Sequence, residues 1–328
     1  KRPAVRANTI RHYKYVFEHN VQPYIGNPKL TEITRLMVTD VLNKLKEKGY
    51  QWESLNKVKI LLTDMFERAV DDEFMLKNPA KHIKIPVAKP EHEVKALSKE
   101  DQQAFFQCSS GTFYDNLFRV AVSTGLRPGE LFALTEDNID FDKKEIHVEK
   151  TLLYQKLEGD TGKTFHENDP KTISSKRVVP MNKYCEEALQ RQLILHKMIV
   201  SNSPKPKGER TNYIFCTIYG TPLCSQIYAD AITRIVKEIN YSRDPLEAME
   251  KFSGHCFRHT FATRCFEAGI PPKTVQAYLG HATLQMTMDL YTSVMDKKKI
   301  DDMQLLEDTI GLDEIDKPDP NSKIIKLA

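Results

Sequence analysis

Apolar residues recur at spacings of three and four along the first 80 residues, which is the period of an amphipathic helix. The segments with this pattern are residues 9–26, 35–49 and 55–75. The second segment stops at Gly49, a residue that commonly follows the last turn of a helix. Residues 1–85 are therefore predicted to form a small helical domain without strands.

A stretch without periodicity follows this helical part. Residues 86–97 include Pro86 and Pro90, and proline interrupts regular structure, so we interpret this stretch as an interdomain linker. Ser98 followed three residues later by Asp101 resembles a capping box, which marks the start of a helix. A second domain is therefore expected to begin at residue 98 and to extend to residue 295.

The second domain has helical and strand-like patterns in turn. A helix that should end at Gly125 precedes two strand-like stretches, and a polar, glycine-containing segment separates those stretches. The fold class predicted for the chain is mainly α, with a helical bundle followed by a mixed α+β domain that carries one small antiparallel sheet. In this domain helices are expected near 99–109, 115–123, 183–200, 224–239, 256–269 and 272–280, and strands within 144–157 and 175–182.

Residues 296–328 are predicted to form a tail that contains a helix. Ile300, Met303, Leu306 and Ile310 lie on one helical stripe, and Gly311 follows it. Such a stripe must be covered, either by the same domain or by a neighbouring subunit in an exchange between subunits.

Composition excludes several classes of protein. No apolar run reaches the roughly 18 residues that a membrane-spanning helix needs. The six cysteines form no C-x-x-C pair, which argues against a structural zinc site and against a disulfide scaffold and favours a reduced, cytoplasmic protein. No cofactor is expected. The chain does not begin with methionine, which suggests a processed or partial chain.

The net charge of +3 hides a gradient along the chain. Residues 1–90 carry 17 Lys and Arg against 10 Asp and Glu, a net of +7, whereas residues 300–328 carry 3 against 8, a net of −5. A basic first domain suggests a polyanion as partner, because neutralised phosphates release their counterions. A solvated basic face without a partner explains this charge equally well.

The segment GHCFRHTFAT contains the first candidate chemistry. His255 and Arg258 are three residues apart, so on a helix they share a face and could hold one anion together. H-x-x-R also occurs by chance, and a simple ion pair on a helix surface is the main alternative.

The segment TGLRPGEL contains the second candidate. Arg127 follows a helix that ends at Gly125 and precedes a helix that should begin at Pro128, and the free amides of a helix N-terminus favour an anion. Glu130 could orient Arg127 or could interact with the helix dipole, which is the commoner role.

Four motifs in this order resemble those of the tyrosine recombinases, a family that includes the integrases of phages and of conjugative transposons. These are TGLRPGEL, PKTISSKRVVPM, GHCFRHTFAT and LGHATLQMTMDLYTSV, and the resemblance covers residues of about 8 to 295. Carried over position by position, it implies the catalytic set Arg127, Lys171, His255, Arg258, His281 and Tyr291.

This resemblance implies a site-specific DNA recombinase, with an N-terminal core-binding SAM-like bundle and a catalytic domain. Tyr291 would attack a DNA phosphodiester to form a 3′-phosphotyrosyl bond, and the arginines would stabilise the developing charge. His255 would accept the proton of the phenol, and Lys171 would protonate the leaving 5′-oxygen. The expected partners are double-stranded DNA, a homotetramer on two duplexes, and an accessory DNA-bending or excision factor.

Several alternatives stay open. The segment before Lys171 is longer than the turn of many relatives. Either it is an inserted hairpin that helps to hold DNA or a partner, or the match of Lys171 to the motif shifts and Lys163 is an alternative acid. Arg177 and its neighbour Lys176 could contact DNA or merely decorate a hairpin, whereas His259 and Tyr278 are expected to be structural. A type IB topoisomerase and a non-catalytic DNA-binding protein on the same scaffold are the alternative functions.

Overall fold

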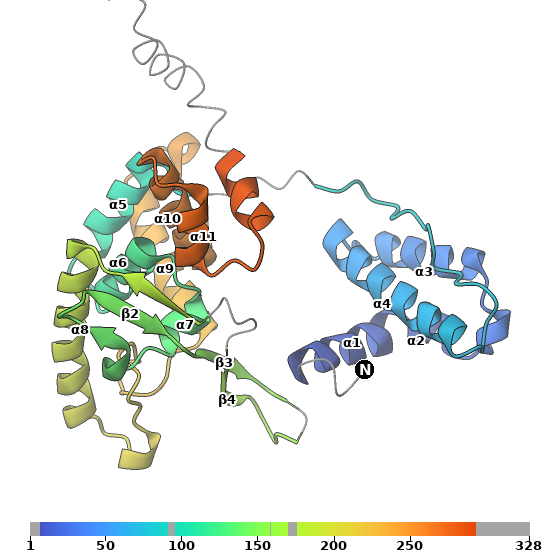
Figure 1. Cartoon of the computed structure of the whole chain (residues 1–328), viewed down its shortest axis with the longest axis horizontal. Coiled ribbons are helices and arrows are strands. Elements are labelled where there is room, and N and C mark those ends of the chain that lie inside the picture. Colours follow the sequence, from blue (N-terminus) through green and yellow to red (C-terminus); the bar gives the residue numbers. More distant parts are fainter. Residues whose placement is uncertain (1–6, 91–95, 158, 170–175, 293–328) are drawn as a thin grey trace, which may run out of the picture. The chain divides into compact units, whose positions relative to one another are not determined.

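A computed structural model describes residues 7–90, 96–157, 159–169 and 176–292 of the protein (Figure 1). The chain divides into two compact units, one of Lys1–His92 with Gln155–Thr164 and the other of Glu93–Tyr154 with Phe165–Ala328. The predicted domain boundaries, including the linker at 86–97, stay a prediction, and the predicted tail helix lies outside the described residues.

The first unit is a bundle of helices, as the spacing of its apolar residues indicates. Leu42 and Leu45 of one helix pack with Leu55, Leu62 and Phe66 of the next in a fully buried core. The segment expected as one helix at 9–26 is two helices, because Pro23 has no amide to donate within a continuing helix. The helices of this bundle are α1 (Ala7–Asn20), α2 (Gln22–Ile25), α3 (Arg35–Glu47) and α4 (Trp52–Asp71).

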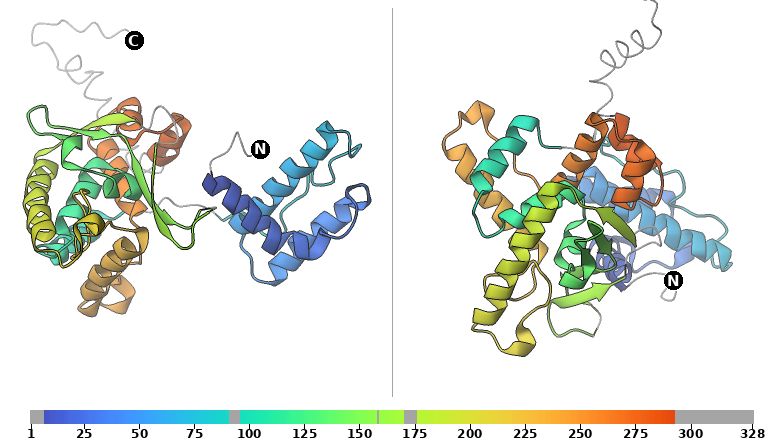
Figure 2. Two further views of the ribbon diagram at one scale, coloured as in Figure 1. Left: turned by 90° about the horizontal axis from the view of Figure 1, so that it is seen from below. Right: turned by 60° about the vertical axis from the view of Figure 1, so that its left-hand side comes forward.

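The second unit is mainly helical. Ser98 caps its first helix by accepting a hydrogen bond from the amide of Asp101 at 2.9 Å, and Gly125 ends the next in the left-handed conformation, with φ of 62°. Both features were expected from the sequence. Helices α6 and α8 pack along each other (Figure 1 and Figure 2). The helices are α5 (Lys99–Ser109), α6 (Asp115–Thr124), α7 (Pro128–Phe132), α8 (Lys183–Asn202), α9 (Ser225–Tyr241), α10 (His255–Glu267) and α11 (Pro272–Leu279), and residues 285–292 are also helical.

Two small sheets accompany these helices. A three-stranded antiparallel sheet has the order β1-β2-β5, with Ile146 opposite Val179, and a two-stranded sheet pairs β3 with β4. The stretch 144–157 is thus two strands in different sheets. The long polar segment before Lys171, for which an inserted hairpin was one of the alternatives, contains strand β4, which pairs with β3. The strands are β1 (Ile139–Asp140), β2 (Glu145–Val148), β3 (Thr151–Gln155), β4 (Thr164–Asn168) and β5 (Arg177–Pro180).

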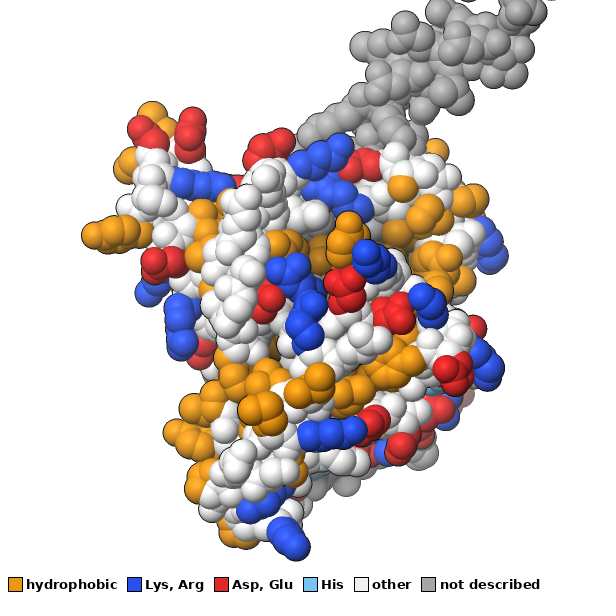
Figure 3. All heavy atoms as spheres, turned by 90° about the vertical axis from the view of Figure 1, so that its left-hand side faces the viewer, with side chains coloured by type: hydrophobic (Ala, Val, Ile, Leu, Met, Phe, Trp, Pro, Cys, Tyr) orange, Lys and Arg blue, Asp and Glu red, His pale blue; other side chains and the backbone are white. Residues whose placement is uncertain are grey.

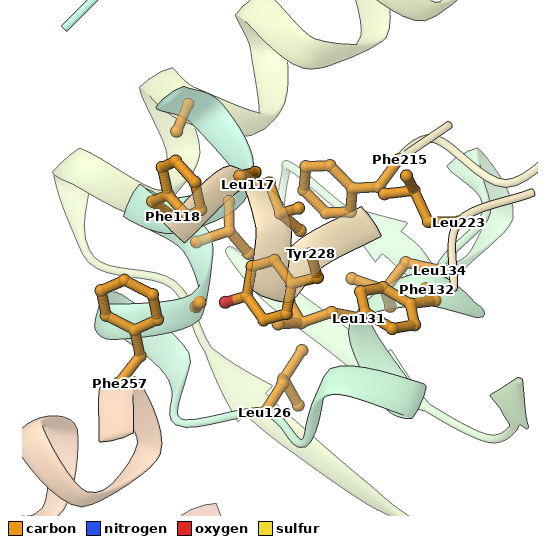
Figure 4. Packing of buried hydrophobic residues seen from close by; sticks show 14 of the residues in the cluster. Leu117, Phe118, Leu126, Leu131, Phe132, Leu134, Phe215, Leu223, Tyr228 and Phe257 are labelled. Carbon is orange, nitrogen blue, oxygen red and sulfur yellow. The ribbon is translucent and has the colours of Figure 1, made fainter. Parts of the chain in front are cut away.

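One hydrophobic core joins the elements that carry the candidate residues. Leu126 and Leu131, which flank Arg127, pack in the same buried cluster as Phe257 of α10. Figure 4 shows these side chains around the ring of Tyr228. Because Phe257 precedes Arg258 in sequence, burial of this cluster fixes the chain at both arginines. The predicted fold class is confirmed.

One face of the molecule has a mixed surface (Figure 3). On the face in Figure 3, hydrophobic side chains form a band among scattered Lys, Arg, Asp and Glu, so this face lacks a continuous positive surface. Within the described ranges, no helix is long and apolar enough to cross a membrane.

Candidate active site

Glu130 lies at the centre of a cluster of charged side chains. Its side chain is only 3% exposed. One oxygen, Oε1, accepts a hydrogen bond from Nη1 of Arg127 at 2.8 Å and another from Nη1 of Arg177 at 3.2 Å. The other, Oε2, accepts from the backbone amide of Arg127 and from Nη2 of Arg177, both at 2.9 Å. The carboxylate therefore bridges two arginines.

This bridge bears on the two roles considered for Glu130. Its main partners are two guanidinium groups, which favours the orientation of Arg127 over interaction with the helix dipole. The backbone amide of Arg127 is bonded to Glu130 as well, so this amide is not available to an anion. Burial opposes ionisation of Glu130, but the hydrogen bonds and charge of Arg177, followed by the charge of Arg127, outweigh burial and keep its pKa below the usual range.

Arg258 is held on the same side of the domain by backbone carbonyl groups. Its guanidinium donates from Nη1 to the carbonyl of Gly125 at 2.8 Å and from Nη2 to that of Leu279 at 2.7 Å, and the residue is 4% exposed. Burial and the positive charge of Arg127 lower its pKa to about 9, so the side chain stays charged at neutral pH. A surface ion pair, the alternative considered for this motif, does not describe Arg258.

The C-terminus of α11 brings three arginines together. The last carbonyl groups of a helix have no partner within it. Here Tyr278 accepts from Nε of Arg177 at 2.6 Å, Leu279 from Arg258, and Gly280 from Nη2 of Arg127 at 3.4 Å. Gly280 caps the helix in the left-handed conformation, with φ of 63°. Successive carbonyl groups at one helix end thus position guanidinium groups from three separate parts of the chain.

Two histidines lie within the field of these arginines. His281 is 7% exposed, and its Nδ1 is hydrogen-bonded to the hydroxyl of Thr287 at 2.9 Å. Burial first, and then the charges of Arg258 and Arg127, lower the pKa of His281 to about 4. His255 is exposed at the start of α10, and partial loss of solvent together with the same arginines lowers its pKa as well. Both rings are therefore neutral at pH 7.

The low pKa of His281 predicts a loss of stability in acid. Unfolded histidine titrates near pH 6.5, so between that value and about 4 the unfolded chain binds more protons than the folded chain. The free energy of unfolding should fall as the pH is lowered through this window, by up to about 3 kcal/mol for this group. Urea denaturation at a series of pH values would measure this fall in the free energy of unfolding. His281→Asn should give a shallower dependence, and an equal dependence in both proteins would contradict the assignment.

Tyr291 lies on the helix that follows this cluster. Its ring packs edge to face on Phe266, with 5.1 Å between ring centroids, beside a small apolar cluster that includes Leu290. Within the described part of the chain the Tyr291 hydroxyl makes no hydrogen bond to the arginines. Thr287, the partner of His281, is one turn before Tyr291 on the same helix, so this bond links the tyrosine-bearing helix to the cluster.

The structure brings together some residues of the predicted catalytic set and not others. Arg127, Arg258, His255 and His281 are brought together around the end of α11. The structure does not place the Tyr291 hydroxyl among them. Lys171 lies outside the described residues, whereas its alternative, Lys163, is exposed.

The sequence did not identify the role of Arg177. Both roles considered for it, DNA contact and hairpin decoration, require exposure, but its side chain is only 6% exposed and binds Glu130. Its neighbour Lys176 is exposed, at 3.8 Å from Asp169. One pattern could have indicated that Arg177 is buried. Side chains alternate along a strand, so adjacent residues lie on opposite faces.

The arrangement suits the binding of an anion. Three guanidinium groups and one carboxylate leave a net positive charge beside two neutral imidazoles, and Arg127 keeps 34% of its side chain exposed. Such a cluster can neutralise a phosphate without a metal ion. Among the residues that the structure describes, no group of three or more His, Cys, Asp or Glu side chains could hold a metal.

Comparisons with known proteins identify the family of the chain. Residues 90–298 match the phage integrase family, and residues 1–46 match the N-terminal SAM-like domain of phage integrases. Over 308 residues the chain is 30% identical to a tyrosine recombinase XerC-like protein of Caldanaerobacter subterraneus subsp. tengcongensis, a match that covers 89% of this chain and 76% of the relative. The chain is also 28% identical over 302 residues to the transposase from transposon Tn916 of Enterococcus faecalis. This match covers 89% of this chain and 71% of the relative.

A solved structure of similar fold extends the comparison. The integrase of the Tn1549 transposon, in complex with transposon right end DNA, superimposes with a TM-score of 0.76 at 26% identity and covers 90% of this chain and 94% of that one. The fold of the chain is therefore similar to that of a DNA-bound integrase. The chain belongs to the phage integrase family, the tyrosine recombinases that catalyse DNA strand exchange.

Proposed function

We propose that this protein is a site-specific recombinase that cleaves and rejoins double-stranded DNA through a 3′-phosphotyrosyl intermediate, for the integration and excision of a mobile element. The observation that carries the proposal is the convergence of Arg127, Arg258, His255 and His281 at the end of α11. The similarity to transposon integrases, one of them bound to transposon end DNA, supports this choice of substrate.

The proposed reaction exchanges one phosphodiester for another. The phenolic oxygen of Tyr291 attacks the scissile phosphorus, a bond to the tyrosine forms, and the bond to the 5′-oxygen breaks. Negative charge increases on the nonbridging oxygens, where Arg127 and Arg258 donate forked hydrogen bonds. The phosphotyrosyl bond conserves the energy of the broken bond, so rejoining needs neither a nucleotide cofactor nor hydrolysis.

Proton transfer requires a base and an acid. His255 is neutral at pH 7, so it can accept the proton of the Tyr291 phenol. When the Thr287 hydroxyl donates to Nδ1 of His281, the ring proton lies on Nε2, which can then donate to a phosphate oxygen. Lys171 is proposed as the acid that protonates the leaving 5′-oxygen.

The proposed assembly is a homotetramer that joins two duplexes in the cytoplasm, with an accessory DNA-bending or excision factor as a further partner. The tail at 296–328, proposed to exchange between subunits, would help to hold this assembly together.

The proposal is tested by a strand-exchange assay with two labelled duplexes that carry the ends of the element. Recombinant products of the expected length should form without a nucleotide or a divalent metal ion. Relaxation of supercoiled DNA without recombinant product would favour the topoisomerase. DNA binding with neither reaction would favour the non-catalytic scaffold.

The basic first unit predicts salt-dependent binding of DNA. Residues 1–90 carry a net charge of +7, and each neutralised phosphate releases counterions. The affinity for a duplex of random sequence should fall about a hundredfold or more between about 50 mM and 200 mM salt. Fluorescence anisotropy would measure this fall. An affinity that does not change with salt would remove the role assigned to this unit.

A further inference from the structure

Arg177 has the contacts of a residue that acts through its neighbours. Its guanidinium donates to both carboxylate oxygens of Glu130 and to the carbonyl of Tyr278. The side chains of Arg177 and Arg258 are both buried, but Arg258 binds two neutral carbonyl groups and, within the described residues, keeps an unpaired charge, whereas the charge of Arg177 is paired with the carboxylate of Glu130. Arg177 therefore has less charge to offer a DNA phosphate. These contacts join β5 to α7 and to the end of α11.

The charge of Glu130 explains why a second arginine is needed. A buried carboxylate with one partner would draw the guanidinium of Arg127 toward itself and cancel its charge. Arg177 makes two hydrogen bonds to the same carboxylate, at 3.2 and 2.9 Å, so the negative charge is shared. Arg127 then keeps its orientation from Glu130, while the group of three charges retains a net positive charge.

The end of α11 gives Arg177 a second route to the site. It binds the carbonyl of Tyr278, the residue immediately before the two whose carbonyls bind Arg258 and Arg127. A shift of this carbonyl would move the neighbouring ones, because the three belong to one helix end. Displacement of a positioned group by about 1 Å can reduce a reaction rate about a hundredfold.

We propose that Arg177 is a positioning residue for strand cleavage, which balances the charge of Glu130 so that Arg127 is free to bind the scissile phosphate and which fixes the end of α11. The inference rests on the proposed function and adds to it a residue outside the predicted catalytic set. Arg177 itself does not touch the DNA.

The test measures cleavage of a nicked suicide DNA substrate in a single turnover, with DNA affinity and thermal unfolding measured in parallel. Arg177→Met should reduce the cleavage rate about a hundredfold, while DNA affinity changes by less than about threefold. Arg243→Met is the matched control: it also removes an arginine that is paired with a carboxylate, that of Asp101 at 2.7 Å, but one that binds neither Glu130 nor the end of α11, and it should cleave at nearly the native rate.

A second substitution separates charge balance from simple packing. The double variant Arg177→Met with Glu130→Gln lacks the carboxylate whose charge Arg177 no longer balances. Its cleavage rate should therefore recover about tenfold over that of Arg177→Met alone. A merely structural role predicts the reverse, because the second change removes further contacts. Arg177→Lys, which keeps the charge but cannot reach every acceptor, should lose less activity than Arg177→Met, and it serves if Arg177→Met does not fold.

The outcomes distinguish this inference from the proposed function. If the native protein cleaves DNA and Arg177→Met is equally active, the role of Arg177 is overturned and the proposed function stands. The same follows if the double variant cleaves no faster than Arg177→Met. No adduct from the native protein would overturn the proposed function and this inference with it.

Discussion

Tyr291→Phe is expected to abolish the covalent protein–DNA adduct on a suicide substrate. The change removes only the hydroxyl group, which is the proposed nucleophile. The ring contact with Phe266, at 5.1 Å between centroids, is apolar and needs no hydroxyl, so folding and DNA affinity should be preserved. Denaturing electrophoresis of the reaction should show the adduct for the native protein and none for the variant.

Tyr278→Phe is the matched control for this experiment. Tyr278 lies on α11, near the same cluster, but it takes part through its backbone carbonyl, which the substitution leaves in place. This variant should form the adduct at close to the native rate. Persistence of the adduct in Tyr291→Phe would instead reassign the nucleophile.

Arg258→Lys is expected to cause the second largest loss, a fall in the cleavage rate of about 10²- to 10³-fold. Lysine keeps the charge but has no planar fork, so it cannot serve the carbonyls of Gly125 and Leu279 and a phosphate together. A buried carbonyl without its donor costs about 1–3 kcal/mol, so the free energy of unfolding should also fall. Single-turnover cleavage and urea denaturation measure the two effects.

Arg264→Lys controls for the loss of an arginine from the same helix. Arg264 binds Gln102, Glu267 and the carbonyl of Leu97, and it makes none of the contacts at the end of α11. Its replacement should cost some stability and leave the cleavage step nearly unchanged. Equal losses of cleavage in the two variants would indicate that Arg258 acts only through stability.

Local signals in the sequence were sufficient for much of the fold. Gly125 and Ser98 mark helix ends through their own backbone and side-chain chemistry, so a single position carries the information. The bounds of strand β4 were not predicted, although an inserted hairpin was one alternative for its segment, because its residues Thr164–Asn168 are mostly polar and lack a strong alternating pattern. Its pairing with the preceding strand, β3, defines it as a strand, and such pairing is not visible in the residues of β4 alone.

The candidate site divides in the same way. Arg127, His255, Arg258 and His281 were identified because each lies in a compact motif. The role of Arg177 depends on Tyr278, which is 101 positions further along the chain, and on Glu130, 47 positions before it. No local pattern encodes such contacts, and a basic residue in a polar stretch is ordinarily solvated. The predicted roles of Lys171 and Tyr291 stay predictions.

The central claim is that one scissile phosphate is bound by arginines collected at the end of α11 while Tyr291 lies behind it. A crystal structure of Tyr291→Phe with a duplex that carries the end of the element tests this most directly. We expect one phosphate within hydrogen-bonding distance of both Arg127 and Arg258, with the ring of residue 291 on the side opposite the leaving 5′-oxygen. A DNA backbone that bypasses these arginines, or a ring that faces another surface, would contradict the account.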